Sequence, residues 1–418
     1  MISKFRIKNF RSIVDLTLDF SYGEGKAPNG YKTMDTHPFL KAPNGERLVP
    51  CMAFFGANAS GKSTIMYAFI RLQRILEKGL RDKESIMYTP NALHPELTST
   101  IFEITYFIRL DKNNEKKEQK SVYRIEYNQT GIINESLACD DKIIYQIQNG
   151  IGFFPGIIDK DYSPERLQKI IQIECSDAIN HQNFTLLKTL YTNYTQLSDS
   201  VIVANWGLMN MICSSNVGAN YYKSLSNIIH NNGDAFENKM KERLFELIQR
   251  MDIDIKGFSF EYDFLKRRRL MSHHEDVNGN IIKFDFLESE SDGTCVLLLL
   301  LYELDFVLQF GGVYIVDELD CSLHPRIVRE LIKIIKLKRY NKNNAQLIFT
   351  SHTTDILEDE LMRVSEITVV NKNTKYGTKA HRVVDIKREF GDLDIRNVTN
   401  FRKQYVQGFY TGVPHPTI

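Results

Sequence analysis

The sequence predicts an α/β fold, in which a mixed sheet is interrupted by a mainly helical insertion. The apolar run Val49–Phe55 leads into a glycine-rich loop, and apolar residues then follow at the spacing of one helix face: Ile65, Phe69, Leu72 and Leu76. The run Val313–Val316 is too short and too β-branched to prefer a helix, and two acidic residues follow it. Between these two strands, residues 150–252 change in character towards helices.

The segment G-A-N-A-S-G-K-S-T (56–64) lies at a strand–loop–helix junction, which is the position of a phosphate-binding loop. Its glycines allow the backbone to wrap around phosphates, and the helix N-terminus stabilises negative charge. Lys62 is placed to reach the outer phosphates of ATP, and Ser63 can ligate Mg²⁺. The context disfavours the alternative, a turn that binds nothing. The residues expected to hold the nucleotide are Gly56, Asn58, Ser60, Gly61, Lys62, Ser63 and Thr64.

Two acids follow the second strand, at the carboxyl end where ligands bind in open α/β sheets. We expect Asp317 to hold Mg²⁺ together with Ser63, and Glu318 to polarise the attacking water. Glu318 and Lys62 are therefore catalytic candidates. Adjacent acids can also merely end a strand, and it is the phosphate-binding loop that weighs against this alternative.

The order and spacing of the motifs carry a resemblance to a known group of proteins. Asp317 follows Lys62 by 255 residues, far more than in compact P-loop ATPases. Further segments are I-S-K-F-R-I-K-N-F-R-S (2–12), E-S-D-G-T (290–294), D-E-L-D-C-S-L-H-P (317–325) and I-F-T-S-H (348–352). This order resembles the ABC-type ATPase heads of SMC, RecF and OLD-type proteins, with a signature, a Walker B and D-loop segment, and a switch strand ending in His352.

A narrower resemblance is to bacterial AAA-type ATP-binding proteins of the RloA/AbiL-like kind, which are associated with abortive infection and anti-phage defence. It rests on the basic and His-containing strand 267–274, on the E-S-x-G-T signature and on the tail R-K-Q-Y-V-Q-G-F-Y-T-G-V-P (402–414). Two features depart from the pattern. Cys295 follows the signature in place of a basic residue, and Gln119 lies in a charged turn and is a poor Q-loop candidate.

The resemblance implies a head-to-head homodimer, in which each ATP lies between the P-loop of one protomer and the signature of the other. It assigns the γ-phosphate sensor to His352. A signature that precedes the helix Val296–Phe310 is physically suited to an anion. The alternatives are an ordinary helix N-cap at Ser291 and a core histidine at 352. The contacts assigned to the signature and D-loop are Ser291, Asp292, Gly293, Thr294 and His324.

We expect three parts along the chain. Ala235–Met251 is the clearest helix of the middle part, with Asp234 placed to cap it, and its apolar face is too short for a long coiled coil. The parts are the N-terminal section of the ATPase head (1–150), a helical lid, dimerisation or partner-binding subdomain (151–252), and the C-terminal section of the head (253–418).

Smaller features complete the expected layout. A glycine- and proline-rich insertion at 21–47 predicts a surface loop or hairpin, and strands at 100–110 and 121–127 flank a solvated turn. The sheet is expected to resume at 256–287. After Pro325 we expect a helix with Ile327, Leu331 and Ile334 facing inward.

Composition sets outer limits on the protein class. Hydrophobic residues make up 43% of the 418 residues and the net charge is +1, which fits a soluble globular protein without a wholesale nucleic-acid coat. No apolar stretch is long enough to cross a bilayer, and basic residues interrupt the N-terminal apolar residues. The six cysteines lack C-x-x-C spacing, so a cytoplasmic protein with reduced thiols is expected.

Two basic clusters are candidates for nucleic-acid contact. The first is Lys266–Arg269 with His273 and His274, and the second is a helix face within 329–342. A solvated face, or pairing with acidic residues, is the alternative for both, and no metal other than Mg²⁺ is expected. The second face is expected to carry Arg329, Lys333, Lys336, Lys338 and Arg339.

Three functions remain open from the sequence. The leading one is an ATPase switch that controls a separately encoded, nuclease-like effector in anti-phage defence. Only 66 residues follow His352, too few for a nuclease domain of the chain's own. The alternatives are a RecF-like DNA-binding ATPase in repair or maintenance, and a scaffold locked by ATP with little turnover.

Overall fold

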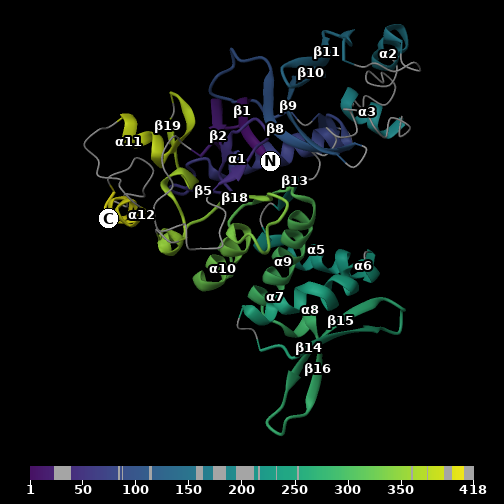
Figure 1. Ribbon diagram of the computed structural model, residues 1–418, viewed down its shortest axis with the longest axis vertical. Coiled ribbons are helices and arrows are strands. Elements are labelled where there is room, and N and C mark those ends of the chain that lie inside the picture. Colours follow the sequence, from purple (N-terminus) through teal and green to yellow (C-terminus); the bar gives the residue numbers. More distant parts are fainter. Residues whose placement is uncertain are drawn as a thin grey trace.

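The computed structural model describes most of the chain, with a long sheet in its upper part and helices with a smaller sheet below (Figure 1). Expectations on the insertion at 21–47 and on the C-terminal tail fall partly outside the described residues. Not described are residues 23–38, 83–84, 87, 113–114, 157–162, 173–184, 194–210, 215–216, 232, 252–253, 359–360, 374, 390–397 and 409–418.

The main sheet has thirteen strands, and its two halves run differently. One half is parallel and holds the apolar strands expected from the motifs. Its strands, in sheet order, are β19 (Ile367–Asn373), β5 (Cys51–Phe55), β18 (Gln346–Thr350), β17 (Val313–Val316) and β13 (Met211–Ser214). The ends of β5, β17 and β18 therefore carry the P-loop, the acid pair and His352 to one edge of the sheet.

The other half is antiparallel and extends the sheet outward from β19. The strands at 100–110 and 121–127 are longer than expected, because most of the charged turn between them is itself paired as strand. Its strands, in sheet order, are β20 (Gly377–Arg382), β2 (Ile13–Asp19), β1 (Ile2–Phe10), β8 (Thr100–Lys112), β9 (Glu115–Tyr127), β10 (Ile132–Cys139), β11 (Lys142–Gln148) and β12 (Ile151–Phe153). Two short hairpins lie beside it, β3 (Leu40–Lys41) with β4 (Arg47–Leu48) and β6 (Arg81–Asp82) with β7 (Ser85–Ile86).

Helices cover both faces of the parallel half because its strands are apolar on both sides. In β5, Cys51, Ala53 and Phe55 belong to one core and the alternating Met52 and Phe54 to the other. The first core contains α9 (Asp292–Phe310) and α10 (Pro325–Lys336), and the second contains α1 (Lys62–Lys78). Short 3₁₀ turns, η5 (Thr354–Ile356) and η6 (Val364–Glu366), follow β18.

The described part of the middle block is mainly helical, and it is joined to the main sheet because residues 211–214 form β13. The expected helix Ala235–Met251 contains a π-helical turn at Met240–Leu244, and its predicted apolar face is buried. Asp234 lies inside the first turn instead of capping the helix, because α6 begins at Gly233. The helices are α2 (Pro164–Ile170), α3 (Leu186–Asn193), α5 (Val217–Asn231), α6 (Gly233–Lys239) and α7 (Phe245–Arg250).

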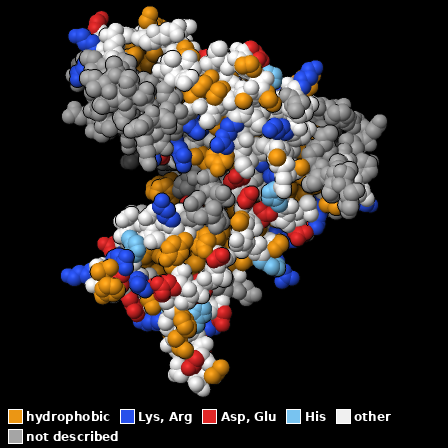
Figure 2. Space-filling view, turned by 180° about the vertical axis from the view of Figure 1, so that it is seen from behind, with side chains coloured by type: hydrophobic (Ala, Val, Ile, Leu, Met, Phe, Trp, Pro, Cys, Tyr) orange, Lys and Arg blue, Asp and Glu red, His pale blue; other side chains and the backbone are white. Residues whose placement is uncertain are grey.

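The expectation that the sheet resumes at 256–287 is wrong in one respect. These residues form a separate three-stranded antiparallel sheet, β14 (Gly257–Tyr262), β15 (Arg268–Glu275) and β16 (Ile281–Asp285), followed by α8 (Phe286–Ser289). This small sheet projects at the lower end of the molecule, and Figure 2 shows hydrophobic side chains on its surface. Local alternation predicted the strands correctly but could not assign them to a sheet.

The C-terminal segment and α9 complete the core. After β20 come α11 (Val383–Glu389) and α12 (Val398–Val406), whose Phe401 and Tyr405 are buried beside Phe55. Among the described residues, α9 is the one helix long and apolar enough to cross a membrane, and 61% of its most apolar stretch is buried inside the protein. Its leucines pack around β17, as expected for a core helix.

Candidate functional site

The P-loop is held in a shape that requires glycine at two positions. Gly61 caps α1 with φ at +105°, and a β-carbon there would lie 2.2 Å from the hydroxyl of Thr378. At Gly56, a β-carbon would lie 2.3 Å from the carbonyl oxygen of Val370. The hairpin β19–β20 therefore lies directly behind the loop and leaves no room for side chains at either glycine.

Small hydroxyl side chains connect the loop to the strands behind it. Ser12, in the turn between β1 and β2, lies 2.8 Å from the Thr378 hydroxyl and donates to Thr64 at 3.3 Å. Thr378 in turn donates to the carbonyl of Ser60 at 3.4 Å. The opening segment of the chain thus supports both sides of the P-loop.

Lys62 is buried, and its ammonium group lies within the curve of the loop. Nζ donates to the carbonyl oxygens of Gly56 at 2.7 Å and Ala57 at 3.1 Å. Desolvation lowers the pKa of Lys62, while the charges of the nearby acids, Asp317 first, act to raise it. The lysine and the acids thus lie close enough to form one electrostatic site.

Thr350, at the end of β18, fixes the two acids that follow β17. Its hydroxyl donates to Asp317 Oδ1 and accepts from the backbone N–H of Glu318, both at 2.7 Å. Asp317 is buried, whereas the Glu318 side chain is 42% exposed and its backbone has a φ of +58°. Such a left-handed conformation is uncommon for glutamate, and here it turns Glu318 away from the direction of the strand.

His352 lies beside Glu318, as the resemblance implies for a phosphate sensor. Its Nε2 lies 4.0 Å from Glu318 Oε1, and its ring is 45% exposed, so it is not a core histidine. Asp320 fixes the switch segment, since Oδ2 accepts from the backbone N–H groups of His352 at 3.0 Å and Thr353 at 2.9 Å. The site thus has one buried acid, one exposed acid and one exposed imidazole.

The residues present fit ATP and Mg²⁺. Ser60 Oγ in the loop and Asp320 Oδ1 beyond β17 are buried, and neither has a hydrogen-bond partner in the described part of the chain. Asp317 Oδ1 accepts from Thr350, so Oδ2 is the oxygen that would hold Mg²⁺, together with the hydroxyl of Ser63. A hollow of about 730 Å³ borders loop residues 57–60 and the β19–β20 hairpin, including Tyr376.

The signature residues begin α9, as the N-cap alternative predicted. Ser291 Oγ accepts from the backbone N–H of Thr294 at 3.2 Å, and Asp292 accepts from Tyr221 at 2.6 Å. Gly293 lies against the D-loop, where a β-carbon would be 2.7 Å from the Ser322 carbonyl oxygen. Cys295 faces the core, and burial raises its pKa to about 12.

His324 is engaged as the N-cap of α10. Its Nδ1 accepts from the backbone N–H of Arg326 at 3.2 Å, and Pro325 occupies the first helical position, as expected. The side chain is exposed beside the D-loop. A contact between His324 and a nucleotide stays a prediction.

The first basic cluster is largely paired with acids. Arg267 binds Asp263 at 2.9 Å, Arg268 binds Asp234 at 2.6 Å, and Arg269 Nη1 lies 3.1 Å from Asp285. His274 binds Glu290 at 2.7 Å, and His273 lies 2.8 Å from the Ser259 hydroxyl. Lys266 is exposed and has no ion pair among the described residues. In the described part of the chain, no three or more His, Cys, Asp or Glu side chains come together in a way that could hold a metal ion.

The second basic face is not the continuous stripe that was expected. Helix α10 ends at Lys336, so Lys338 and Arg339 lie beyond it. Lys336 is buried, where it binds Glu366 at 2.6 Å and also donates to the carbonyl of Leu361. Helical spacing alone placed Lys336 outside because its acidic partner is distant in the sequence.

The residues that position the site were not predicted from the motifs. Thr350 and Asp320 lie inside the quoted motifs, but their roles depend on β17 and β18 being neighbours. Thr378 supports the P-loop from a strand that carries no motif. For Thr350 and Asp320 the available signal was a polar residue within the motif itself, whereas no motif pointed to Thr378.

The fold and the site define a P-loop ATPase domain, and the predicted α/β class is confirmed. A family model described as "AAA domain, putative AbiEii toxin, Type IV TA system" matches residues 51–358, which include the P-loop, both acids and His352. The chain belongs to this family. Among curated proteins, no significant match was found.

Proposed function

We propose that this chain is a cytoplasmic ABC-type ATPase that closes as a head-to-head dimer around two Mg·ATP molecules. In this proposal its ATP cycle controls a separately encoded, nuclease-like effector in anti-phage defence. The observation that carries the ATPase part is the convergence of Lys62, Asp317 and Glu318 beyond the ends of β5 and β17, the two strands that flank β18. The signature Ser291–Thr294 is a second anion-suited helix N-terminus, which the family resemblance pairs with the P-loop of a second copy.

The chemistry follows from where the groups lie. The loop amides and Lys62 bind the phosphates, and Ser63 and Asp317 would hold Mg²⁺, which would neutralise negative charge on the phosphates when bound. Glu318 is exposed and can orient and deprotonate the attacking water, whereas buried Asp317 cannot reach bulk water as readily. His352, fixed through Asp320, stands beside Glu318 to contact the γ-phosphate.

The exposure of the signature supports a site completed by a second copy. Ser291 and Asp292 are exposed, and their hydrogen bonds in the described chain go to Thr294 and Tyr221. Nothing in these contacts engages the P-loop of the same chain. Two anion-suited helix N-termini in one chain are readily explained if the P-loop helix faces the protomer's own nucleotide and the signature helix faces the nucleotide of the partner protomer.

The dimer is tested by weighing the protein in solution by mass photometry, with and without Mg·ATP. Wild type should shift from monomer towards dimer with ATP. Glu318→Gln should hold the dimer because hydrolysis is slowed by about 10²- to 10⁴-fold. Lys62→Ala should stay monomeric because a charge-assisted phosphate contact is lost. ATP-dependent dimerisation that persists in Lys62→Ala would contradict the P-loop's role in closure.

The effector is the finer part of the proposal. It is supported by the family's description, which names a toxin and a toxin–antitoxin system, and by the RloA/AbiL-like resemblance. Co-expression with the genomic neighbours, followed by purification, should yield a complex whose mass or composition changes with ATP. If Glu318→Gln abolishes hydrolysis but leaves defence intact, the scaffold alternative replaces the switch. A lone dimer without a bound neighbour would remove the effector part while leaving the ATPase part standing.

A further inference from the structure

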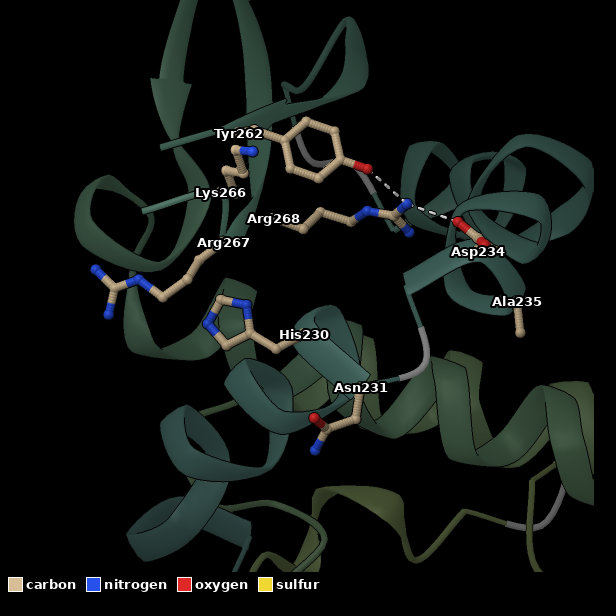
Figure 3. A pocket seen from close by; sticks show the side chains of 8 residues that line it. All are labelled: His230, Asn231, Asp234, Ala235, Tyr262, Lys266, Arg267 and Arg268. Carbon is tan, nitrogen blue, oxygen red and sulfur yellow. Dashed lines mark hydrogen bonds and ion pairs between the residues drawn. The ribbon is translucent and has the colours of Figure 1, made fainter. Parts of the chain in front are cut away.

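A second open pocket, remote from the ATP motifs in the sequence, lies between the small sheet and the middle helices. Its volume is about 720 Å³. Tyr262, Lys266, Arg267 and Arg268 line one wall from the β14–β15 connection, and the ends of α5 and α6 line the other wall, with His230 prominent (Figure 3). The size matches ordinary ligand pockets, and the basic wall favours an anionic ligand.

The arginines of this wall retain donors although they are paired with acids. Arg268 Nη2 is shared between Asp234 Oδ1 at 2.6 Å and the Tyr262 hydroxyl at 2.9 Å. Arg268 Nη1 is buried and has no hydrogen-bond partner in the described part of the chain. Asp234 is 92% exposed, so its carboxylate remains solvated by water when a phosphate displaces it from Arg268.

Apolar side chains stand next to these charges, and the turn that carries them is braced. Phe264 is 88% exposed, Leu265 is 58% exposed and Tyr262 is 63% exposed. Asp263 holds the turn, since its Oδ1 accepts from the backbone N–H groups of Leu265 and Arg267, both at 2.8 Å. The turn thus presents an aromatic ring to solvent in a fixed conformation, beside the exposed ammonium of Lys266.

We propose that this pocket and the adjoining turn bind a segment of single-stranded nucleic acid. Lys266, Arg267 and Arg268 contact phosphates, and an unpaired base stacks on Phe264 or Tyr262. Basic side chains that follow the backbone, combined with aromatic rings that take bases of any sequence, are the chemistry of single-strand recognition. A duplex hides the faces of its bases, so it cannot use the aromatic part of this site.

Both walls of the pocket are attached to the signature segment. On the strand side, two residues of β15 contact Glu290, the residue before Ser291. The Ser272 hydroxyl donates a hydrogen bond to it, and His274 Nε2 binds the same carboxylate oxygen. On the helix side, α5 ends at the pocket, and its Tyr221 donates to Asp292 at 2.6 Å. If the signature binds ATP, as the proposed function holds, nucleic-acid affinity and ATP affinity are coupled reciprocally.

The test measures binding of a fluorescein-labelled 15-nucleotide dT oligonucleotide to the full chain by fluorescence anisotropy, without ATP. K266E/R267E should weaken binding at least tenfold. Each lost phosphate contact should reduce the salt slope by about 0.7, and so by about 1.4 for the pair. Phe264→Ala should weaken binding about 5- to 100-fold through lost stacking. Asp234→Asn should strengthen it, because the competing carboxylate loses its charge.

R74E/K78E is the matched control, with the same change in charge at two exposed residues of α1. It should bind as wild type does, and far-UV circular dichroism checks that every variant is folded. An equal loss in both double variants, or none in K266E/R267E, would overturn the site. Equal affinity for a 15-base-pair duplex, or equally effective competition by free TMP at the same nucleotide concentration, would overturn the single-strand assignment. Because ATP is absent, these results do not depend on the proposed ATPase cycle.

Discussion

The parallel and antiparallel halves of the main sheet differ in where their functionally important charged residues lie. In the parallel half, β17 and β18 have four and five residues, all buried, and the chemistry lies beyond their ends. In the antiparallel half, β8 and β9 have 13 residues each, and a carboxylate is buried in the middle of neighbouring β10. The parallel half therefore carries its acidic residues beyond the carboxyl ends of its strands, whereas the antiparallel half buries a carboxylate within a strand.

The enclosed carboxylate is Glu135, and it ties a distant helix to the sheet. It accepts from the backbone N–H groups of Leu186 at 2.7 Å and Leu187 at 3.2 Å, where α3 begins. It also accepts from Tyr145 at 2.7 Å and Tyr123 at 3.1 Å. Lys188 of α3 in turn donates to the carbonyl of Glu77 on α1, the helix that follows the P-loop. The buried carboxylate of the antiparallel half therefore positions α3, and α3 in turn contacts α1 of the catalytic half.

The largest expected effect is on stability, from Glu135→Ala. It leaves two buried N–H groups and two buried tyrosine hydroxyls without their acceptor, so we expect unfolding free energy to fall by about 3–5 kcal/mol. Urea denaturation followed by circular dichroism measures it. The control is Glu103→Ala on β8, whose carboxylate is 37% exposed and 3.8 Å from Arg124, with an expected loss below about 1 kcal/mol. Similar losses in both variants would remove the distinction between the halves.

A smaller effect on catalysis is expected from Thr350→Val, which keeps the shape but removes the hydroxyl between Asp317 and Glu318. Two hydrogen bonds are lost at the two acids, so the rate of ATP hydrolysis should fall about 10- to 100-fold. The free energy of unfolding should also fall, by about 1–3 kcal/mol, because buried polar groups lose their partner. A coupled phosphate-release assay measures the rate of hydrolysis. Thr105→Val on β8 is the control, and it should hydrolyse ATP at the wild-type rate. An unchanged rate in Thr350→Val would show that the acids keep their positions without this threonine.

The smallest effect concerns pH. Burial raises the pKa of Glu135 even though four donors act to lower it. A carboxyl group with a raised folded pKa stabilises the fold when protonated, and that contribution is lost as pH rises from the unfolded value, about 4.3, through the folded one. The stability advantage of wild type over Glu135→Gln should therefore shrink between pH 4.5 and pH 7.5. Urea titrations at both pH values test this, and an advantage that grows would contradict the raised pKa.

The same comparison explains what the sequence could predict. The P-loop, Asp317, Glu318 and His352 were predictable because each follows a short apolar strand directly, so local order was enough. Pairings between distant segments were not predictable. The roles of Thr350 and Asp320, the entry of β13 into the main sheet and the separation of β14–β16 from it all depend on which strands are neighbours.

The central claim, that each ATP site is completed by a second copy, is tested most directly by mixing two inactive variants. Lys62→Ala lacks a working P-loop, and Ser291→Arg places a large side chain on an exposed signature residue, where it obstructs only a closed dimer. Neither variant closes with itself, so equimolar mixing should form heterodimers, each with one intact composite site, and restore hydrolysis to at most about half of the wild-type rate. If each chain holds a complete site of its own, Ser291→Arg alone keeps the wild-type rate, and the mixture shows only the mean of the rates of its two components.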